Sequence, residues 1–434
     1  MTEGQQTISN KRIRAASIPP RVSLPEDLVN HVLLLLPART LARFRCVCRS
    51  WNAHITSRGF QESHHALASS VALPLKFAFL PMAARGPCIK HFPGCRGCPR
   101  LVGTKPCRGV VLVERRCGGK FSVCNLSTGG VLHLPLPPRA NFIDDVFHSA
   151  GIGFDASTGE YKVVNLRVNC TDKARCNVLT LSDDSTGDWR PLAAAAAADQ
   201  FLPDCHVFVD KDVDPVFADG SLHWMFKTDG TRYDEPHGIL SFSLADESFR
   251  RAPQPFFSTA DLALLDYESA DPQRSRVGFT SSGDSVIMPA GRALTELNGS
   301  LCIVRDVRRR NDVEGLFEIW KLQDYEAGSW SMDFIISLAG DIAEQLTKPW
   351  LVLPICYLGG SRRKIVLVTS ARKVHVYDAD TNDVHTVAAS LTDDMVRKAE
   401  EPSEFVRFLL YQKSLVQLDG MEYDDREIQF VQMM

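Results

Sequence analysis

The spacing of apolar residues changes along this 434-residue chain. Between residues 22 and 65 apolar residues recur every three or four positions, which is typical of amphipathic helices. Beyond about residue 100 they alternate with polar residues, which is typical of strands with one buried face. This change of period predicts a multidomain α+β chain in which a small all-α module precedes an all-β domain.

The helical module is predicted to contain two helices. The first follows a capping box, Ser23-Leu24-Pro25-Glu26, and ends at Pro37, because the residue before a proline avoids the α region. Thr40 is expected to cap the second. The apolar stripe of this second helix consists of Leu41, Phe44, Cys48, Trp51 and Ile55. Such a small pair buries little core, so part of its apolar surface is expected to face a partner. The alternative is a helical hairpin packed on the rest of the chain.

Hairpin signatures recur in the second part of the chain. One of them leads from Gly151–Asp155 through a turn at 156–159 into a strand that carries Val164 and Leu166 on one face. Asp219-Gly220 and Asn298-Gly299 each precede an apolar strand, where glycine supplies the positive φ of a tight hairpin turn. Strand groups that repeat every few tens of residues favour a β-propeller, because closure hides edge strands. The number of blades stays open.

The order of motifs in the helical module resembles the F-box pattern. It is carried by Leu24-Pro25-Glu26-Asp27-Leu28, Leu36-Pro37, the stretch from Leu41 to Trp51, and Phe60. The pieces 125–129, 151–164 and 220–224 resemble the F-box associated domain of plant F-box proteins, which is propeller-like. The expected layout is a disordered tail at 1–21, the F-box at 22–65, a Cys- and Pro-rich linker at 66–107, a β-propeller-like substrate-recognition domain at 108–420 and a C-terminal tail at 421–434.

This resemblance implies a function based on binding. In the family the F-box binds a Skp-type adaptor on a cullin scaffold, and the complex ubiquitinates what the other domain holds. The chain is therefore expected to be a non-catalytic substrate receptor of an SCF-type ligase, without a cofactor and with an unnamed target protein. The adaptor-facing positions implied are Leu24, Pro25, Leu28, Leu36, Pro37, Leu41, Val47, Cys48 and Trp51. Trp51 is the best hot-spot candidate, because its large ring fills a pocket.

Two other functions remain open from the sequence. The chain is a propeller-fold carbohydrate-binding protein or enzyme if the helical module is only structural, because propellers host both activities. The F-box could also act outside a ligase. The sequence contains no GxSxG elbow, no Walker loop, no dinucleotide fingerprint following a strand and no HExxH motif, so the enzyme reading has no positive support.

One cysteine-rich segment is a candidate metal site. It holds Cys88, Cys95, Cys98 and Cys107, with His91 among them. The spacing of Cys95 and Cys98 matches half of a zinc ribbon, but Cys88 and Cys107 do not form the second close pair that a ribbon supplies. We expect reduced cysteines and keep zinc as the alternative.

Other conspicuous residues have simple structural readings. His223-Trp224 is expected in the core, with the indole packed and the imidazole hydrogen-bonded. The runs 308–310 and 362–364 are basic and are expected in solvated loops, with contact to an acidic target segment as the alternative. The alanine run 193–198 is expected to be a surface insertion.

Composition limits partners and location. The net charge of −3 provides no field for nucleic acid or an anionic membrane. The first twenty residues lack the apolar run of a signal peptide, and no apolar stretch reaches transmembrane length. We expect an intracellular protein, in the cytoplasm, the nucleus or both, with Lys11, Arg12 and Arg14 as a possible nuclear address.

Overall fold

The computed structural model describes both the helical module and the β-domain. The described residues are 24–69, 77–79, 99–115, 119–138, 145–169, 175–182, 186–192, 208–209, 214–227, 238–253, 255, 277–279, 285–287, 292–306, 316–337, 346, 352–358, 362–369, 373–389, 409–423 and 431–433. The expected N-terminal tail, with Ser23 and the basic group at 11–14, lies outside them, as do the alanine run and the run at 308–310.

Four helices form the N-terminal module. They are α1 (Glu26–Leu34), α2 (Ala38–Phe44), α3 (Arg49–Thr56) and α4 (Arg58–Ser69). None of these described helices is long and apolar enough to cross a membrane. The predicted single second helix was wrong, because the chain breaks between α2 and α3. Cys48 is extended there (φ −160°, ψ 165°), and its thiol accepts a hydrogen bond from the backbone N–H of Trp51 at 3.4 Å, which starts α3.

The start of α2 also differs from the prediction. Pro37 (φ −60°, ψ 143°) occupies the N-cap position and Thr40 lies inside the helix. Pro25 takes the same position before α1. Proline suits a helix start because its missing N–H leaves no helical hydrogen bond unmade there. The break after α2 lets the chain turn, so that the rings of Phe44 and Trp51 pack with centroids 5.4 Å apart.

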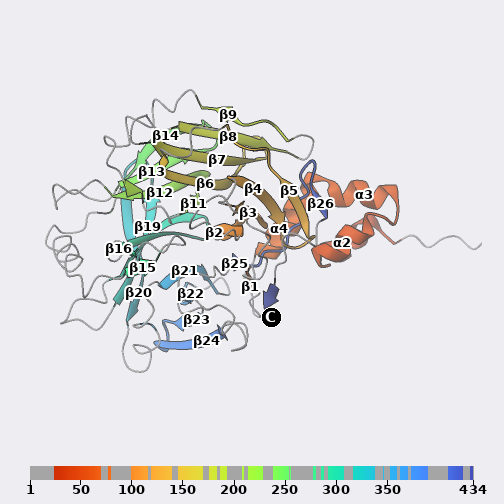
Figure 1. Ribbon diagram of the computed structural model, residues 1–434. Helices are drawn as coiled ribbons and strands as arrows, with labels where there is room; N and C mark the ends of the chain where they lie inside the picture. The colour runs from red at the N-terminus through yellow and green to blue at the C-terminus, as the bar shows by residue number, and fades with distance from the viewer. Residues whose placement is uncertain are drawn as a thin grey trace, which may run out of the picture.

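Five antiparallel sheets follow as the blades of a β-propeller (Figure 1). Blade 1 contains β2 (Pro99–Cys107), β3 (Val110–Arg115), β4 (Lys120–Asn125) and β5 (Gly130–His133). Blade 2 contains β6 (Asp145–Asp155), β7 (Glu160–Asn169), β8 (Arg175–Leu181) and β9 (Arg190–Pro191). Blade 3 contains β11 (Val216–Ala218), β12 (Ser221–Lys227), β13 (Gly238–Ser243) and β14 (Ser248–Ala252), with β10 (Phe208–Val209) also paired to β12.

The last two blades repeat the four-strand order. Blade 4 contains β17 (Arg292–Leu297), β18 (Ser300–Asp306), β19 (Leu316–Asp324) and β20 (Ser329–Ser337). Blade 5 contains β21 (Val352–Tyr357), β22 (Lys364–Thr369), β23 (Lys373–Asp378) and β24 (Asp383–Ala389). A two-stranded sheet, β15 (Val277–Phe279) with β16 (Ser285–Ile287), lies between blades 3 and 4 in the sequence. The predicted helical module followed by an all-β propeller is confirmed.

Strands from distant parts of the chain join the ring. β1 (Phe77–Phe79) pairs with β25 (Leu409–Leu410) and with β27 (Val431–Met433), and β26 (Glu422–Tyr423) extends blade 1 at β5. β25 lies beside β2 of blade 1, and its Leu410 packs with Ile355 and Val366 of blade 5. The segments 66–107 and 421–434, which we expected to be a linker and a tail, therefore contribute strands to the β-domain.

The turns between strands repeat from blade to blade. Tight two-residue turns with positive φ at both residues join the first two strands at Arg108-Gly109, Asp219-Gly220 and Asn298-Gly299. The predictions for the last two are confirmed. Between the third and fourth strands a side-chain oxygen accepts a backbone N–H and closes the turn, and this oxygen belongs to Asn125, Ser243, Asp324 or Asp378. Both kinds of turn lie on one face of the propeller, because antiparallel strands reverse direction at each turn.

Tryptophan side chains tie neighbouring blades together. The indole N–H of Trp189 donates to the carbonyl of Pro135 at 2.7 Å, and that of Trp330 donates to the carbonyl of Pro253 at 3.2 Å. In both cases the tryptophan lies at or just before the fourth strand of one blade, and the proline follows the fourth strand of the preceding blade. Each indole thus packs between blades, with Trp189 buried and Trp330 half-buried, and satisfies its donor.

Candidate functional site

Helix α1 divides its apolar residues between two faces. Val29 and Leu33 of α1, and Leu36 just beyond its end, pack in the core of the helical module. On the opposite side the exposed fractions are 67% for Leu24, 55% for Leu28, 57% for Val32 and 60% for Leu35, and Val47, between α2 and α3, is exposed at 61%. We call these five residues the exposed apolar set. Water-exposed leucine and valine at this density mark a binding surface.

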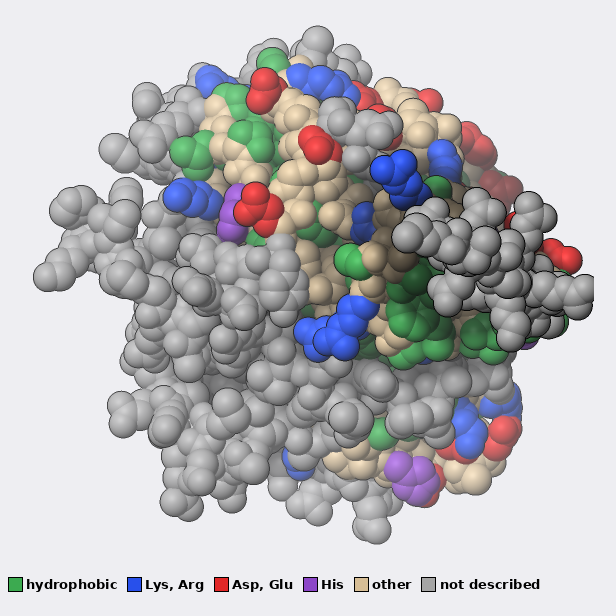
Figure 2. Space-filling model, turned by 90° about the vertical axis from the view of Figure 1, so that its right-hand side faces the viewer, with side chains coloured by type: hydrophobic (Ala, Val, Ile, Leu, Met, Phe, Trp, Pro, Cys, Tyr) green, Lys and Arg blue, Asp and Glu red, His purple; other side chains and the backbone are tan. Residues whose placement is uncertain are grey.

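Apolar side chains also gather on this side of the molecule in the space-filling view (Figure 2), which looks at the propeller from the side that carries the helices. Within α1 the exposed Leu28 and Val32 are four residues apart, which keeps them on one face of the helix, and Leu24 and Leu35 flank the helix at its two ends. The surface is therefore preformed by the helix, and a partner that covers it gains apolar burial at about 25 cal/mol per Å².

The nine residues that the sequence implied for adaptor contact occupy different environments. Leu24, Pro25, Leu28, Pro37, Val47 and Cys48 are exposed. Leu36 and Trp51 are half-buried and pack against the core of the module. Leu41 is fully buried in that core, so its side chain packs internally. Sequence reasoning omitted Val32 and Leu35 from the set, although their spacing from Leu28 places them on the same face.

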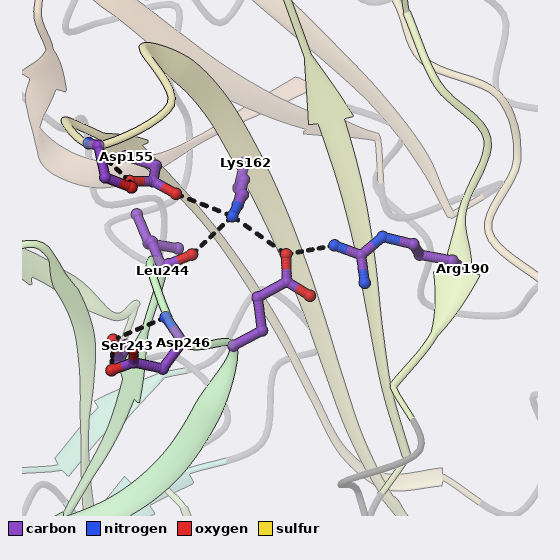
Figure 3. Close-up of polar contacts among 8 residues, drawn as sticks. Asp155, Lys162, Arg190, Ser243, Leu244 and Asp246 are labelled. Carbon is purple, nitrogen blue, oxygen red and sulfur yellow. Dashed lines mark hydrogen bonds and ion pairs between the residues drawn. The ribbon is translucent and has the colours of Figure 1, made fainter.

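A buried ionic junction joins blades 2 and 3 (Figure 3). The ammonium of Lys162 in β7 lies 3.0 Å from Asp155 Oδ2, 2.6 Å from the carbonyl oxygen of Leu244 and 3.1 Å from Glu247 Oε1. Arg190 of β9 pairs with the same Glu247 carboxylate. Asp155 and Lys162 belong to β6 and β7 of blade 2, and Arg190 belongs to β9 of the same blade. Glu247 lies in the turn between β13 and β14 of blade 3.

Hydrogen bonds and ion pairs within the junction offset the cost of burying its carboxylates. Burial opposes ionisation of Asp155, but hydrogen bonds from Ser157 and Lys162 outweigh it and lower the pKa of Asp155 to about 2. Burial likewise opposes ionisation of Glu247, and Arg190 and Lys162 outweigh it, so its pKa is lowered as well. Both carboxylates stay ionised at neutral pH. This arrangement favours a structural role in holding two blades together over general acid–base chemistry.

Comparison with protein families identifies both parts of the chain. Residues 22–62 match the F-box domain, and residues 91–269 match the F-box associated beta propeller domain. The chain combines an F-box domain with an F-box associated domain. The second match covers the part of the chain that forms blades 1 to 3, and the structure adds two further blades beyond it.

Similar proteins include F-box proteins from Arabidopsis thaliana. F-box protein At1g11270 is 27% identical over 262 residues, which cover 55% of this chain and 77% of that protein. F-box protein At3g61340 is 23% identical over 380 residues, covering 79% and 81%. With another Arabidopsis relative the identity is 28%, and the chain spans about half of its length, 51%.

Solved structures overlap only weakly with this chain. An oligogalacturonate lyase in complex with manganese gives a TM-score of 0.32 at 10% identity, covering 65% of this chain and 62% of the lyase. A chain of a nidogen/laminin complex gives a TM-score of 0.34 at 12% identity, covering 78% and 99%. At these scores neither overlap carries an argument about function.

Histidine and tryptophan at 223–224 lie in the propeller core, as expected. His223 is fully buried, and its Nδ1 lies 3.3 Å from the carbonyl oxygen of Val216. Burial lowers the pKa of His223 to about 4, so the ring is neutral at pH 7. The Trp224 indole donates to Ser149 Oγ at 3.0 Å. Trp224 therefore packs between blades 2 and 3, whereas His223 points to the opposite face of β12 and its ring lies 6.1 Å from that of Tyr325 in blade 4.

The basic run at 362–364 is engaged in ion pairs. Arg362 Nη1 lies 3.2 Å from Asp333 Oδ1, and Lys364 Nζ lies 2.9 Å from Asp378 Oδ2. Arg363 Nε donates to Asp380 Oδ1 at 2.6 Å. Each cation thus has a carboxylate partner within blades 4 and 5, which favours the structural reading of this run.

Of the cysteines in the candidate zinc segment, the structure describes Cys107 alone. Cys88, Cys95 and Cys98 lie outside the described residues. Cys107 is buried at the end of β2, and burial raises the pKa of its thiol to about 12, which disfavours the thiolate that zinc requires. Among the residues that the structure describes, no group of three or more His, Cys, Asp or Glu side chains is placed to hold a metal ion.

Proposed function

We propose that this protein is the substrate receptor of an SCF-type cullin ubiquitin ligase. The F-box binds a Skp-type adaptor through the exposed apolar set, and the propeller holds a target protein. The chain itself supplies no catalytic group, and its effect on the target comes from proximity to the ubiquitin-loaded enzyme. This function needs no cofactor.

The observation that carries the proposal is the division of α1 into two apolar faces. An F-box that served only as a scaffold element would bury both faces against the propeller. Here Leu28 and Val32 remain more than half exposed, whereas Leu33 on the other face is buried. A surface of this kind needs a second protein to cover it.

The test is binding of a purified Skp-type adaptor to the full-length chain. Leu28→Asp places a charge in the exposed apolar set, so we expect adaptor binding to fall at least tenfold while the thermal unfolding temperature stays unchanged. Val387→Asp is the matched control, because Val387 is 44% exposed on β24 of blade 5. Equal adaptor binding by both variants and the unmodified chain would contradict the proposed function.

Trp51 tests the implied hot spot. We expect Trp51→Ala to weaken adaptor binding by more than about 1 kcal/mol, because a half-buried ring still offers a large apolar surface to a partner. The same change removes packing against Phe44, so far-UV circular dichroism must first show that the helices remain folded. A folded variant with full adaptor binding would remove Trp51 from the interface.

A further inference from the structure

A segment far along the chain completes the F-box core. Leu415 is buried in the same cluster as Leu33, Leu41, Ile55 and Phe60 of the F-box. These residues are separated from Leu415 by the whole propeller sequence. The F-box thus takes one of its core side chains from the end of the β-domain.

Residues 415–418, within the segment 411–418, turn alternately to the two domains. Leu415 packs in the F-box, and Gln417 accepts a hydrogen bond from the Arg45 guanidinium at the end of α2. Val416 lies between them and Leu418 follows Gln417, and both pack in the core of blades 1 and 2. This period of two places an extended strip between the domains, with one side for each.

Blade 1 holds the strip by its backbone. The Asn125 amide donates to the carbonyl oxygens of Ser414 and Val416 at 3.3 and 2.7 Å. The Ser127 hydroxyl accepts from the N–H of Ser414 at 2.9 Å and donates to the carbonyl of Gln412 at 3.2 Å. Ser414 occupies the space where any residue larger than glycine at position 109 would place its side chain. These contacts with blade 1 hold the strip on the propeller independently of the F-box.

Helix α4 makes a second contact with the same face of the propeller. The guanidinium of Arg58 lies directly over Gly159, in the turn between β6 and β7 of blade 2. Contacts at the strip and at this turn suppress rotation of the F-box about either one. The exposed apolar set remains outside both contacts.

We propose that Leu415 and Gln417 are positioning residues, which fix the F-box and hence the bound adaptor in one orientation relative to the target-holding propeller. This inference rests on the proposed function. In a ligase that acts by proximity, a fixed orientation limits which lysines the ubiquitin-loaded enzyme reaches. The chain's own propeller lysines report on that orientation even without a known target.

The experiment uses the full-length chain, saturated with Skp-type adaptor in an assembled cullin ligase, and maps self-ubiquitinated lysines by mass spectrometry. For the unmodified chain we expect a restricted set of propeller lysines. Leu415→Asp is expected to broaden this set and to speed hydrogen exchange in α1–α4 about tenfold or more. Val387→Asp again serves as the control with an exposed starting residue and is expected to change neither.

A swapped pair separates positioning from simple loss of stability. Gln417→Arg places two guanidinium groups together and is expected to broaden the lysine set. Adding Arg45→Gln exchanges the two partners and is expected to restore the original set. The swapped pair decides the matter if Leu415→Asp fails to fold.

The outcomes distinguish the two proposals. Failure of the unmodified chain to bind the adaptor overturns the proposed function. Normal adaptor binding, with the same lysine set for the unmodified chain and the Gln417→Arg variant, overturns only the positioning role. Broadening that the swapped pair does not reverse also overturns it, because the Arg45–Gln417 contact would then not set the orientation.

Discussion

The helical module and the propeller differ in how much of their apolar surface they bury. In the propeller, large clusters fill the spaces between blades, and most strand residues with described side chains are buried. In the F-box, five large apolar residues remain exposed, and the core includes Leu415 from outside the module. The propeller thus buries its apolar residues within its own blades. The F-box depends on a residue of another segment for its core and leaves apolar surface for a partner to cover.

The largest expected effect tests how far the propeller depends on its ionic junction. Lys162→Met leaves the carboxylates of Asp155 and Glu247 without their shared cation, and we expect a loss of about 3–5 kcal/mol in the free energy of unfolding, measured in urea. Lys364→Met is the control, because its ion pair with Asp378 is at the surface, and only a small change is expected. Equal effects of the two changes would refute the structural role of the junction.

A pair of leucines compares the two regions directly. Leu112→Ala empties a fully buried position in blade 1 and should cost about 2–5 kcal/mol in unfolding free energy. Leu28→Ala removes an exposed side chain, so it should change stability by no more than about 0.5 kcal/mol. The comparison fails if the exposed leucine contributes as much to stability as the buried one.

Acid is expected to weaken the propeller through its buried histidines. Burial lowers the pKa of His223 and of His375 to about 4 in the folded chain, below the value of about 6.5 in the unfolded chain. The unfolded state therefore binds more protons between pH 6.5 and 4, and stability falls in that window by about 1 kcal/mol per pH unit for each histidine. The unfolding free energy, measured in urea at several pH values, should fall less steeply with decreasing pH in a His223→Gln variant than in the unmodified chain. A His385→Gln variant, changed at an exposed site, should show the same pH dependence as the unmodified chain.

The smallest expected effect concerns the start of α3. Cys48→Ala removes the thiol that accepts the Trp51 N–H and should cost about 0.5–1 kcal/mol, whereas Cys48→Ser supplies a better cap and should stabilise the helix. Hydrogen exchange of the α3 amides is the measurement. Faster exchange in the serine variant would show that the thiol does not act as a cap.

Local patterns in the sequence were sufficient to predict the architecture. They were not sufficient to predict which apolar residues of the F-box are buried and which are exposed. The change of period gave the two fold types, and the Asp-Gly and Asn-Gly pairs gave two of the hairpin turns, because these features depend on neighbouring residues alone. The break at 45–48 was missed because the apolar stripe continues across it at helical spacing. Spacing reports which residues share a face, not whether the chain stays helical between them.

Long-range features of the site could not be predicted in the same way. Leu41 and Leu28 are both apolar and both fit the F-box pattern, yet one is buried and the other exposed, and this difference depends on where the other helices and Leu415 lie. The pairing of Lys162 with Glu247 likewise depends on the approach of two blades. No local signal in the sequence specifies such contacts between distant segments.

Closure of the ring by β1, β25 and β27 has a consequence for synthesis on the ribosome. β1 is made early, but its partner strands at 409–410 and 431–433 follow only after all five blades. At about 5–20 residues per second, tens of seconds separate the emergence of these strands. During that interval the nascent propeller presents unpaired strand edges, so its maturation should depend on chaperones that shield them until the last strands arrive.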